Sequence, residues 1–176
     1  MSQASKHVEW CLNEAKKEID ECEKLGKRLK HRGLLKVSPN IEEAKKHLAK
    51  AEHNLEGITK FKEINFSDWS MSAGFYCIYH CFLAIAAKFG YESSNQTCTI
   101  ALMRFLKDNN KIQIDGKFID LLEYEEIKDI KEDSVIDLRE GYTYGVQTSV
   151  KDETKINDLK KTCKELVDIT KEIIFK

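Results

Sequence analysis

Between Trp69 and Phe89 the chain is apolar on almost every side, reading WSMSAGFYCIYHCFLAIAAKF. A helix of this length that is hydrophobic all round has to be surrounded by other elements of secondary structure. Ser67 is the expected N-cap of this helix, and Gly90 is expected to end it in the left-handed conformation. We therefore expect a core that is built around one central helix.

The rest of the chain shows the same helical periodicity. Pro39 is the only proline, which favours long uninterrupted helices. Asn40 and Glu43 fit a capping box, and the apolar positions that follow have the three- and four-residue spacing of an amphipathic helix. Residues 111–116 alternate as a short extended segment would, although an isolated strand would have no partner. Helices are expected at about residues 4–32, 41–61, 69–89, 94–108, 118–131, 134–146 and 152–175.

Every strong periodicity in the chain is helical and none has a period of two residues. The fold class is therefore predicted to be all-α, most simply an antiparallel up-and-down helical bundle with short connections. We interpret residues 1–37 as an N-terminal helical extension and residues 38–176 as the bundle itself.

Composition and charge exclude several classes of protein. Apolar residues make up 41% and charged residues 34% of the chain, as in a globular protein with one core. The 29 Lys and Arg residues nearly balance the 30 Asp and Glu residues, which argues against coating of nucleic acid by bulk electrostatics. The aliphatic runs are short and broken by charge, so we expect no membrane-spanning segment and no membrane partner.

The cellular location is predicted from the N-terminus and the cysteines. The first residues, MSQASKHVEW, lack the basic region and apolar stretch of a secretory signal, so a cytoplasmic location is expected. In that compartment cysteines are expected to be reduced thiols, and none of them forms a CxxC pair. The six cysteines are Cys11, Cys22, Cys77, Cys81, Cys98 and Cys163.

Although the net charge of the chain is close to zero, the segment between Gly26 and Lys36 is a local basic patch. This stretch contains five Lys or Arg residues and no acidic residue. One interpretation is the C-terminal end of the first helix, where the helix dipole favours cations. The other is an RNA-binding patch that faces phosphates. Its candidate RNA-binding residues are Lys27, Arg28, Lys30 and Arg32.

Several catalytic motifs are absent from the sequence. Neither GxxxxGK nor GxGxxG occurs, and neither does GxSxG or HExxH, which removes most nucleotide hydrolases, dehydrogenases, serine esterases and zinc proteases. Cys77, His80 and Cys81 lie close together on the central helix, but zinc needs four ligands and no second cluster matches them. Buried cysteines are common packing residues, so we expect no metal and no cofactor. The acidic pairs at residues 125–126 and 132–133 are interpreted as a solvated helix face.

The remaining candidate site is the stretch REGYTYG, which begins at Arg139. Arginine binds phosphate or stabilises a developing anion. The tyrosines, Tyr142 and Tyr144, can donate a hydrogen bond, act as weak acids or stack on a base. The alternative is a helix–helix contact in which Gly141 and Gly145 permit close approach.

The segment that begins at Ile41 resembles the HEPN superfamily (higher eukaryotes and prokaryotes nucleotide-binding). The similar segments are IEEAKKHLAKAEHNLEGI and, after it, WSMSAGFYCIYHCFLAIAAKFGYESSNQTCTIALM. Members typically show A-x-x-x-L-x-x-A-E-x-x-L on the first core helix and YYA-x-x-H-x-x-x-A-L-L on the second, which ends at a glycine and a serine-containing loop. The chain is most similar to the UPF0332 type, whose Arg-x-x-x-x-Tyr-Tyr-like stretch resembles LREGYTYG. The similarity covers roughly residues 41–175.

The resemblance implies a helical bundle that usually forms a homodimer. Many HEPN proteins act as metal-independent ribonucleases, and their nuclease branch carries an Arg followed after four to six residues by a His. In that branch the His takes the ribose 2′-OH proton, and the Arg stabilises the charged phosphorane. In toxin pairs the partner is a minimal nucleotidyltransferase, which can silence the HEPN protein.

The sequence departs from the nuclease pattern at this histidine. Tyr144 stands five residues after Arg139, and no histidine follows Arg139 anywhere in the chain. Gln96 replaces the His of the Ser-x-x-His loop that many relatives carry. Tyrosine titrates near ~10 and is a poor base at pH 7. The sequence therefore leaves open whether the protein is an enzyme, with Arg139, Tyr144 and Tyr142 as the candidate catalytic residues.

Our leading hypothesis is an RNA- or nucleotide-binding protein of the HEPN type that forms a homodimer. It would belong to a toxin–antitoxin or defence pair with a minimal nucleotidyltransferase, as a degenerate metal-independent ribonuclease or as a domain that binds without cutting. The alternative is a non-catalytic helical module that dimerises or binds a partner protein. A metal-binding four-helix bundle is disfavoured because the sequence lacks the Glu-x-x-His pairs of such sites.

Overall fold

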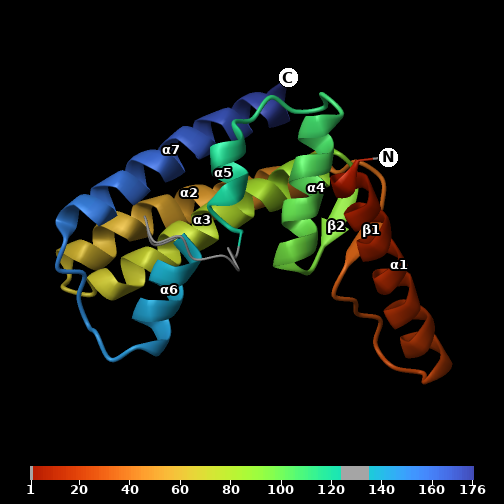
Figure 1. Ribbon diagram of the computed structural model, residues 1–176, viewed down its shortest axis with the longest axis horizontal. Helices are drawn as coiled ribbons and strands as arrows, with labels where there is room; N and C mark the ends of the chain where they lie inside the picture. Colours follow the sequence, from red (N-terminus) through yellow and green to blue (C-terminus); the bar gives the residue numbers. More distant parts are fainter. Residues whose placement is uncertain (1, 124–134) are drawn as a thin grey trace.

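The computed structural model describes residues 2–123 and 135–176 of the chain (Figure 1). Within these ranges the fold is all-α, an antiparallel helical bundle with one small two-stranded sheet. The helices are α1 (Gln3–Lys24), α2 (Ile41–Glu63), α3 (Ser67–Lys88), α4 (Gln96–Asp108), α5 (Gly116–Asp120), α6 (Val135–Tyr144) and α7 (Glu153–Phe175). The strands are β1 (Leu34–Lys36) and β2 (Tyr91–Ser93). The predicted fold class is confirmed.

The apolar segment forms α3, which is the central helix of the bundle. Figure 1 shows α2, α3 and α7 side by side, and α3 also contacts α4 and α6. Gly90 follows α3 with a φ of 78°, which confirms the predicted left-handed end. The predicted N-cap is wrong: Phe66 occupies that position without a side-chain cap, and the Ser67 hydroxyl accepts a hydrogen bond from the Val150 amide at 2.8 Å.

The expectation that no segment could span a membrane is wrong for α3. By length and composition alone, this helix is long and apolar enough to cross a bilayer. In the folded chain, 78% of its most apolar 18-residue window is buried by the other helices. Burial of most of its side chains is the environment that the sequence pattern predicts for a core helix, although Trp69 and Tyr76 of α3 stay about half exposed.

The two long amphipathic helices, α2 and α7, confirm the predicted periodicity. The Asn40 side chain caps α2 by accepting a hydrogen bond from the Glu43 amide at 3.0 Å. Ala44, Leu48 and Ile58 form the buried stripe of α2, while its opposite face carries charged side chains. The buried stripe of α7 consists of Ile156, Leu159, Cys163, Leu166, Val167, Thr170 and Ile174.

The N-terminal region differs from the predicted single helix over residues 4–32. Helix α1 ends at Lys24, and Gly26 follows with a φ of 60°, a conformation that glycine adopts at little cost. Residues 25–33 then form a loop that leads into β1. β1 pairs antiparallel with β2, with Leu34 opposite Ser93. Residues 111–115, where a short extended segment was considered, form no strand.

A disulfide between Cys11 of α1 and Cys98 of α4 corrects the expectation of six reduced thiols. Both residues are buried, and they lie 87 positions apart in the sequence. Cysteine spacing along the chain gives no sign of this pairing, because the two sulfurs are brought together only when α1 packs on α4. The other four cysteines are free thiols.

In the segment between α4 and α7, the described residues 121–123 and 145–146 are not helical, although helices were predicted over 118–131 and 134–146. Helix α5 ends at Asp120, and α6 begins at Val135 and ends at Tyr144. Part of the helix predicted for residues 118–131 lies outside the described residues, as do both acidic pairs at residues 125–126 and 132–133. The division into residues 1–37 and 38–176 stays a prediction.

Candidate functional site

The stretch REGYTYG lies on α6, which packs against α3. The hydroxyl groups of Ser72 and Thr143 join the two helices by a hydrogen bond of 2.9 Å. The loop after α6 also returns to the start of α3, where the Val150 amide binds the Ser67 hydroxyl. These contacts place the predicted site on one side of the central helix.

Arg139 is held in place by an aromatic ring of α3. The carbon atom of its guanidinium lies 4.5 Å from the centre of the Phe75 ring, a cation–π contact. Its Nη2 donates to the Glu140 carboxylate at 3.2 Å, and its side chain is 18% exposed. The Nε atom is buried without a hydrogen-bond partner among the described residues. Arg139 is therefore held in a fixed position against α3, with only part of its guanidinium open to solvent.

Tyr142 and Tyr144 lie differently around α6. Residues three or four apart on a helix share a face, whereas residues five apart do not. Tyr142 is therefore on the same side of α6 as Arg139, and its half-buried ring packs against the core. The side chain of Tyr144 is 77% exposed and projects from another side. Within one chain, the structure groups Arg139 with Phe75 and Tyr142 rather than with Tyr144.

The alternative of close helix packing at the two glycines is wrong. Among the described residues, a Cβ atom built on Gly141 would meet no atom within 4 Å, so no described helix approaches there. A Cβ atom on Gly145 would meet the carbonyl oxygen of Gly141, which belongs to the same helix. These glycines do not mediate a contact between helices.

Two exposed aromatic side chains of α3 extend this surface, and the sequence analysis did not identify them. Trp69 is 50% exposed and Tyr76 is 45% exposed. They lie three residues before and four residues after Ser72, so they share the face of α3 that meets α6. The Tyr76 ring packs edge-on against Phe75 at 5.1 Å. Because α3 is apolar all round, its sequence pattern did not reveal which residues reach solvent.

The four candidate RNA-binding residues lie on the loop after α1, not on a helix. Lys27, Arg28, Lys30 and Arg32 are all exposed. Because α1 ends at Lys24, the interpretation of this stretch as a helix C-terminus is wrong. Figure 1 shows α6 and this loop well apart along the lower edge of the molecule, so the structure does not bring the two predicted clusters together.

The Cys77, His80 and Cys81 cluster is part of the core. Hydrogen bonding with Cys163 and burial raise the pKa of the Cys77 thiol, and burial raises that of Cys81. Both thiols are therefore neutral and unreactive at neutral pH. No group of three His, Cys, Asp or Glu residues in the described part of the chain could hold a metal ion.

His80 instead pairs with His47 of α2. Their Nδ1 atoms lie 3.1 Å apart, a hydrogen bond that requires exactly one proton between them. Burial lowers the pKa of His80 to about 4 and also lowers the pKa of His47. The pair is therefore neutral at pH 7, and neither imidazole lies among the contacts of Arg139 described above.

A cavity of about 670 Å³ lies beside His47, between α2, α3 and β2. Glu43 and Glu92 contribute carboxylates to its wall, and none of the described residues that line it is Lys or Arg. Such a wall repels phosphate groups. The cavity is therefore a poorer site for RNA than the surface formed by α3 and α6.

Gln96, at the position where the resemblance places a histidine, has a structural role. Its Nε2 donates to the Leu122 carbonyl at 2.8 Å, so the side chain ties the start of α4 to the turn after α5. Its amide is therefore already engaged within the fold.

Comparison with known proteins assigns most of the chain to a family. The model described as the HEPN domain matches residues 44–174, which include every helix from α3 to α6, most of α2 and nearly all of α7. No curated protein matches the chain. The matched range includes Arg139 but not the basic loop after α1.

Proposed function

Because this chain belongs to the HEPN domain family, whose members are generally associated with nucleotides or RNA, we propose that it binds RNA on the surface formed by α3 and α6. The observation that carries this proposal is the position of Arg139. Its guanidinium is stacked on Phe75, and the half-exposed ring of Tyr76 packs edge-on against the same Phe75 ring.

Each component suits a different part of an RNA chain. The guanidinium of Arg139 offers charge and hydrogen-bond donors to a phosphate. The exposed rings of Tyr76 and Trp69 offer surfaces on which unpaired bases stack, each stack contributing about 1–3 kcal/mol. Since stacking tolerates every base, we propose single-stranded RNA of broad sequence as the ligand. A free nucleotide would engage only part of this surface.

The catalytic form of the proposal is a degenerate metal-independent ribonuclease. In that reaction the ribose 2′-oxygen attacks the adjacent phosphorus and the 5′-oxygen leaves, while Arg139 stabilises the added negative charge. Tyr142 and Tyr144 are the proposed hydrogen-bonding or acid–base residues. The two tyrosines lie on different sides of α6, so Tyr142 is the one that Arg139 can reach within the same chain.

The proposed setting is a toxin–antitoxin or defence pair with a minimal nucleotidyltransferase, with the UPF0332 type as the proposed branch of the family. HEPN domains are often dimeric, and we propose a homodimer here. A dimer would show twice the mass of one chain by light scattering after size exclusion. A monomeric mass at micromolar concentration would contradict it.

The test is RNA binding and metal-free RNA cleavage by Arg139→Ala. Arg104→Ala is the matched control, since it removes an arginine that is already paired with Asp120 and Glu123. We expect Arg139→Ala to bind RNA about tenfold or more weakly and the control to bind as the wild type does. Arg139→Lys keeps the charge but loses the planar stack, and we expect it to be intermediate.

Urea unfolding of all variants separates loss of binding from loss of fold. Equal RNA binding by the wild type and a folded Arg139→Ala would contradict the proposal. RNA cleavage that depends on Arg139 would establish the catalytic form. Binding without cleavage would establish a domain that binds RNA without cutting it.

A second candidate is a non-catalytic module that binds a protein or a second copy of itself. The observation that favours it is the pair of exposed aromatic side chains at the α3–α6 surface, Trp69 and Tyr76, together with Tyr144, which is exposed on another side of α6. Aromatic residues are enriched at protein interfaces. Tyr76→Ser that abolishes self-association while leaving RNA binding unchanged would support this candidate over the first.

A further inference from the structure

The loop after α1 is a second cationic surface that the family match leaves out. Residues 24–36 contain six Lys or Arg residues and no acidic one. Within the described chain, none of the four central cations, Lys27, Arg28, Lys30 and Arg32, forms an ion pair. We call residues 25–33 the basic loop. Its charges are therefore available to a ligand.

The basic loop is held in one shape by contacts with α1. The Lys27 amide donates to the Cys22 carbonyl at 2.9 Å, and the Cys22 thiol donates to the Lys30 carbonyl at 3.8 Å. The Arg32 amide donates to the Glu18 carboxylate. These bonds use the backbone of the loop and leave its cationic side chains in solvent. A cluster fixed in this way loses less conformational entropy when it binds.

The basic loop is also fixed relative to the HEPN domain. The Cys11–Cys98 disulfide joins α1 to α4, and β1, which follows the loop, pairs with β2. Helix α1 packs along α4. The loop is therefore attached to the bundle at both of its ends, and its distance from Arg139 is set by the fold.

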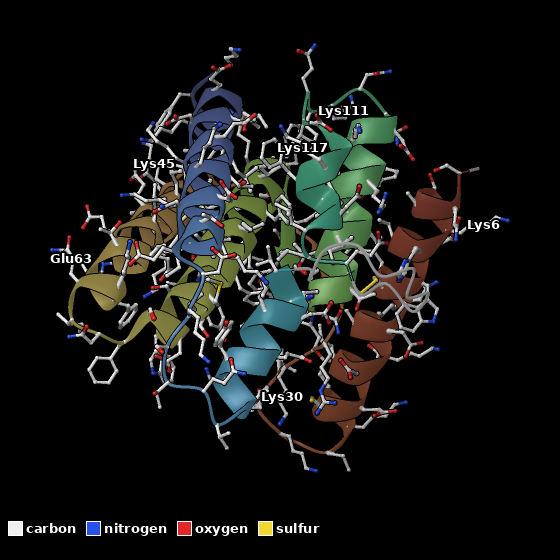
Figure 2. All side chains as sticks on the ribbon, turned by 60° about the vertical axis from the view of Figure 1, so that its left-hand side comes forward. Lys6, Lys30, Lys45, Glu63, Lys111 and Lys117 are labelled. Atoms are coloured by element: carbon white, nitrogen blue, oxygen red, sulfur yellow. A yellow bond between two sulfur atoms is a disulfide. The ribbon has the colours of Figure 1, made fainter. Side chains whose placement is uncertain are left out.

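The basic loop and α6 lie on the same side of the molecule. Figure 1 shows the lower end of α6 and the loop after α1 separated along the lower edge, and Figure 2 shows Lys30 at that same edge after rotation about the vertical axis. A mononucleotide can occupy only one of the two surfaces. A longer RNA can contact both, with its bases at the α3–α6 aromatics and its phosphates at the loop.

We propose that the N-terminal extension of this protein is the second half of an RNA site, and that the ligand is a single-stranded RNA long enough to reach from the α3–α6 surface to the basic loop. This inference rests on the proposed function and specifies its substrate class. It distinguishes an RNA polymer from a nucleotide as the ligand. It also gives the Cys11–Cys98 disulfide a role, because the bond keeps the basic loop at a constant distance from the α3–α6 surface.

The test compares two fluorescent single-stranded RNAs, of about 5 and about 25 nucleotides, by anisotropy at about 0.05–0.3 M salt. We expect the wild type to bind the longer RNA at least about tenfold more tightly per molecule. The loop variant is Lys27→Gln, Arg28→Gln, Lys30→Gln and Arg32→Gln together. We expect it to lose this advantage while binding the shorter RNA as the wild type does.

The slope of log affinity against log salt identifies the contacts. This slope is negative, and each lost phosphate contact on a single strand makes it shallower by about 0.7. The slope for the loop variant should therefore be shallower than that of the wild type by up to about 2.8, for the longer RNA only. The control removes the same charge elsewhere, at exposed lysines away from the lower edge, two of which are labelled in Figure 2. It combines Lys45→Gln, Lys111→Gln, Lys160→Gln and Lys161→Gln.

Two results would overturn the inference while leaving the proposed function intact. One is equal affinity of the wild type for both RNAs. The other is an equal loss in the loop variant and the lysine control, which would mean unspecific charge attraction. If the wild type binds neither RNA, the proposed function itself fails. Cys11→Ala with Cys98→Ala is a second check, since a loosened extension should weaken binding of the longer RNA only.

Discussion

His80 and His47 form the least expected polar contact at the residue scale. In the sequence His80 stands out only for its position between two cysteines, whereas its partner comes from α2, 33 positions away. Burial keeps both imidazoles neutral, and one Nδ1–H donates to the other Nδ1. A second proton would place two N–H groups against each other and break the bond. This pair therefore stabilises the contact between α2 and α3 only while it is neutral.

We expect the pair to make stability depend on pH in a defined direction. The unfolded chain binds a proton at His80 below about pH 6.5, whereas the folded chain binds it only near pH 4. Stability should therefore fall as pH drops through this window. The loss attributable to His80 should be about 1 kcal/mol, since partial exposure weakens the burial effect.

Urea unfolding of the wild type and His80→Leu from pH 7 to pH 4.5 measures this effect. The two curves of stability against pH should converge as the pH falls. The control is His53→Gln, which removes an exposed histidine of α2 and should run parallel to the wild type. Parallel curves for the wild type and His80→Leu would contradict the prediction.

Gly74 and Gly57 provide a matched pair of helical glycines with opposite expectations. A Cβ atom on Gly74 would lie 2.7 Å from Cγ of Leu159, so Gly74→Ala forces α7 away from α3. A Cβ atom on Gly57 would lie 3.6 Å from the Ala73 Cβ, an ordinary contact. We expect Gly74→Ala to destabilise by about 1–2 kcal/mol and Gly57→Ala to stabilise by about 0.5–1 kcal/mol. Thermal unfolding measures both changes in stability. A Gly74→Ala variant that is more stable than the wild type would contradict the prediction, because it would show that a methyl group fits between α3 and α7.

At the scale of elements, α1 differs most from its predicted form. Periodicity indicated a helix to residue 32, and local propensity alone would allow one. The chain leaves the helix at Gly26 instead, because the loop returns along α1 and brings Leu34 into the core, where it is fully buried. By contrast, α2, α3 and α7 were predicted within a few residues. The Asn40 cap of α2, the Gly90 end of α3 and the apolar stripes of α2 and α7 are local signals, and the tertiary contacts agree with them.

The disulfide between α1 and α4 is expected to stabilise the fold measurably. A cross-link closing a loop of this length restricts the unfolded chain, and removing such a bond typically costs about 2–4 kcal/mol. Reduction, or Cys11→Ala with Cys98→Ala, should lower stability by that amount. Cys22→Ala should have a much smaller effect, because this residue is only partly buried and is not cross-linked.

Alkylation of the unfolded protein followed by mass spectrometry tests the pairing directly. Four cysteines should react without a reductant and all six after reduction. Six modified cysteines in unreduced protein would contradict the disulfide and restore the original expectation of reduced thiols.

At the scale of the whole molecule, the extension and the bundle share one continuous core. Val8, Cys11 and Leu34 belong to the same buried cluster as the residues of α3. We therefore expect a chain that begins at residue 38 to lose at least about 3 kcal/mol, since burying Val8 and Leu34 contributes about 1.5–3 kcal/mol each. Urea unfolding of the two chains measures the difference. Equal midpoints would show that residues 1–37 are an independent appendage.

The candidate site was only partly predictable, because its residues come from two helices that are brought together by the tertiary fold. Arg139 was identifiable because an arginine close to two tyrosines and two glycines is an unusual local pattern. Phe75 and Tyr76 were not identifiable, because they come from a helix that is apolar on every side, and only the packing of α6 shows which side remains exposed. The basic loop was visible in the sequence, but its separation from α6 was not.

The sequence by itself determined the all-α class, the long helices α2, α3 and α7, the Asn40 cap, the buried central helix and the family to which the chain belongs. These depend on propensity, periodicity and motif spacing, which act over a few residues at a time. Only the tertiary structure decided where α1 ends, which cysteines pair, how β1 meets β2 and which rings surround Arg139. These depend on contacts between segments far apart in the chain, where the free energy of burying one surface against another outweighs local preference.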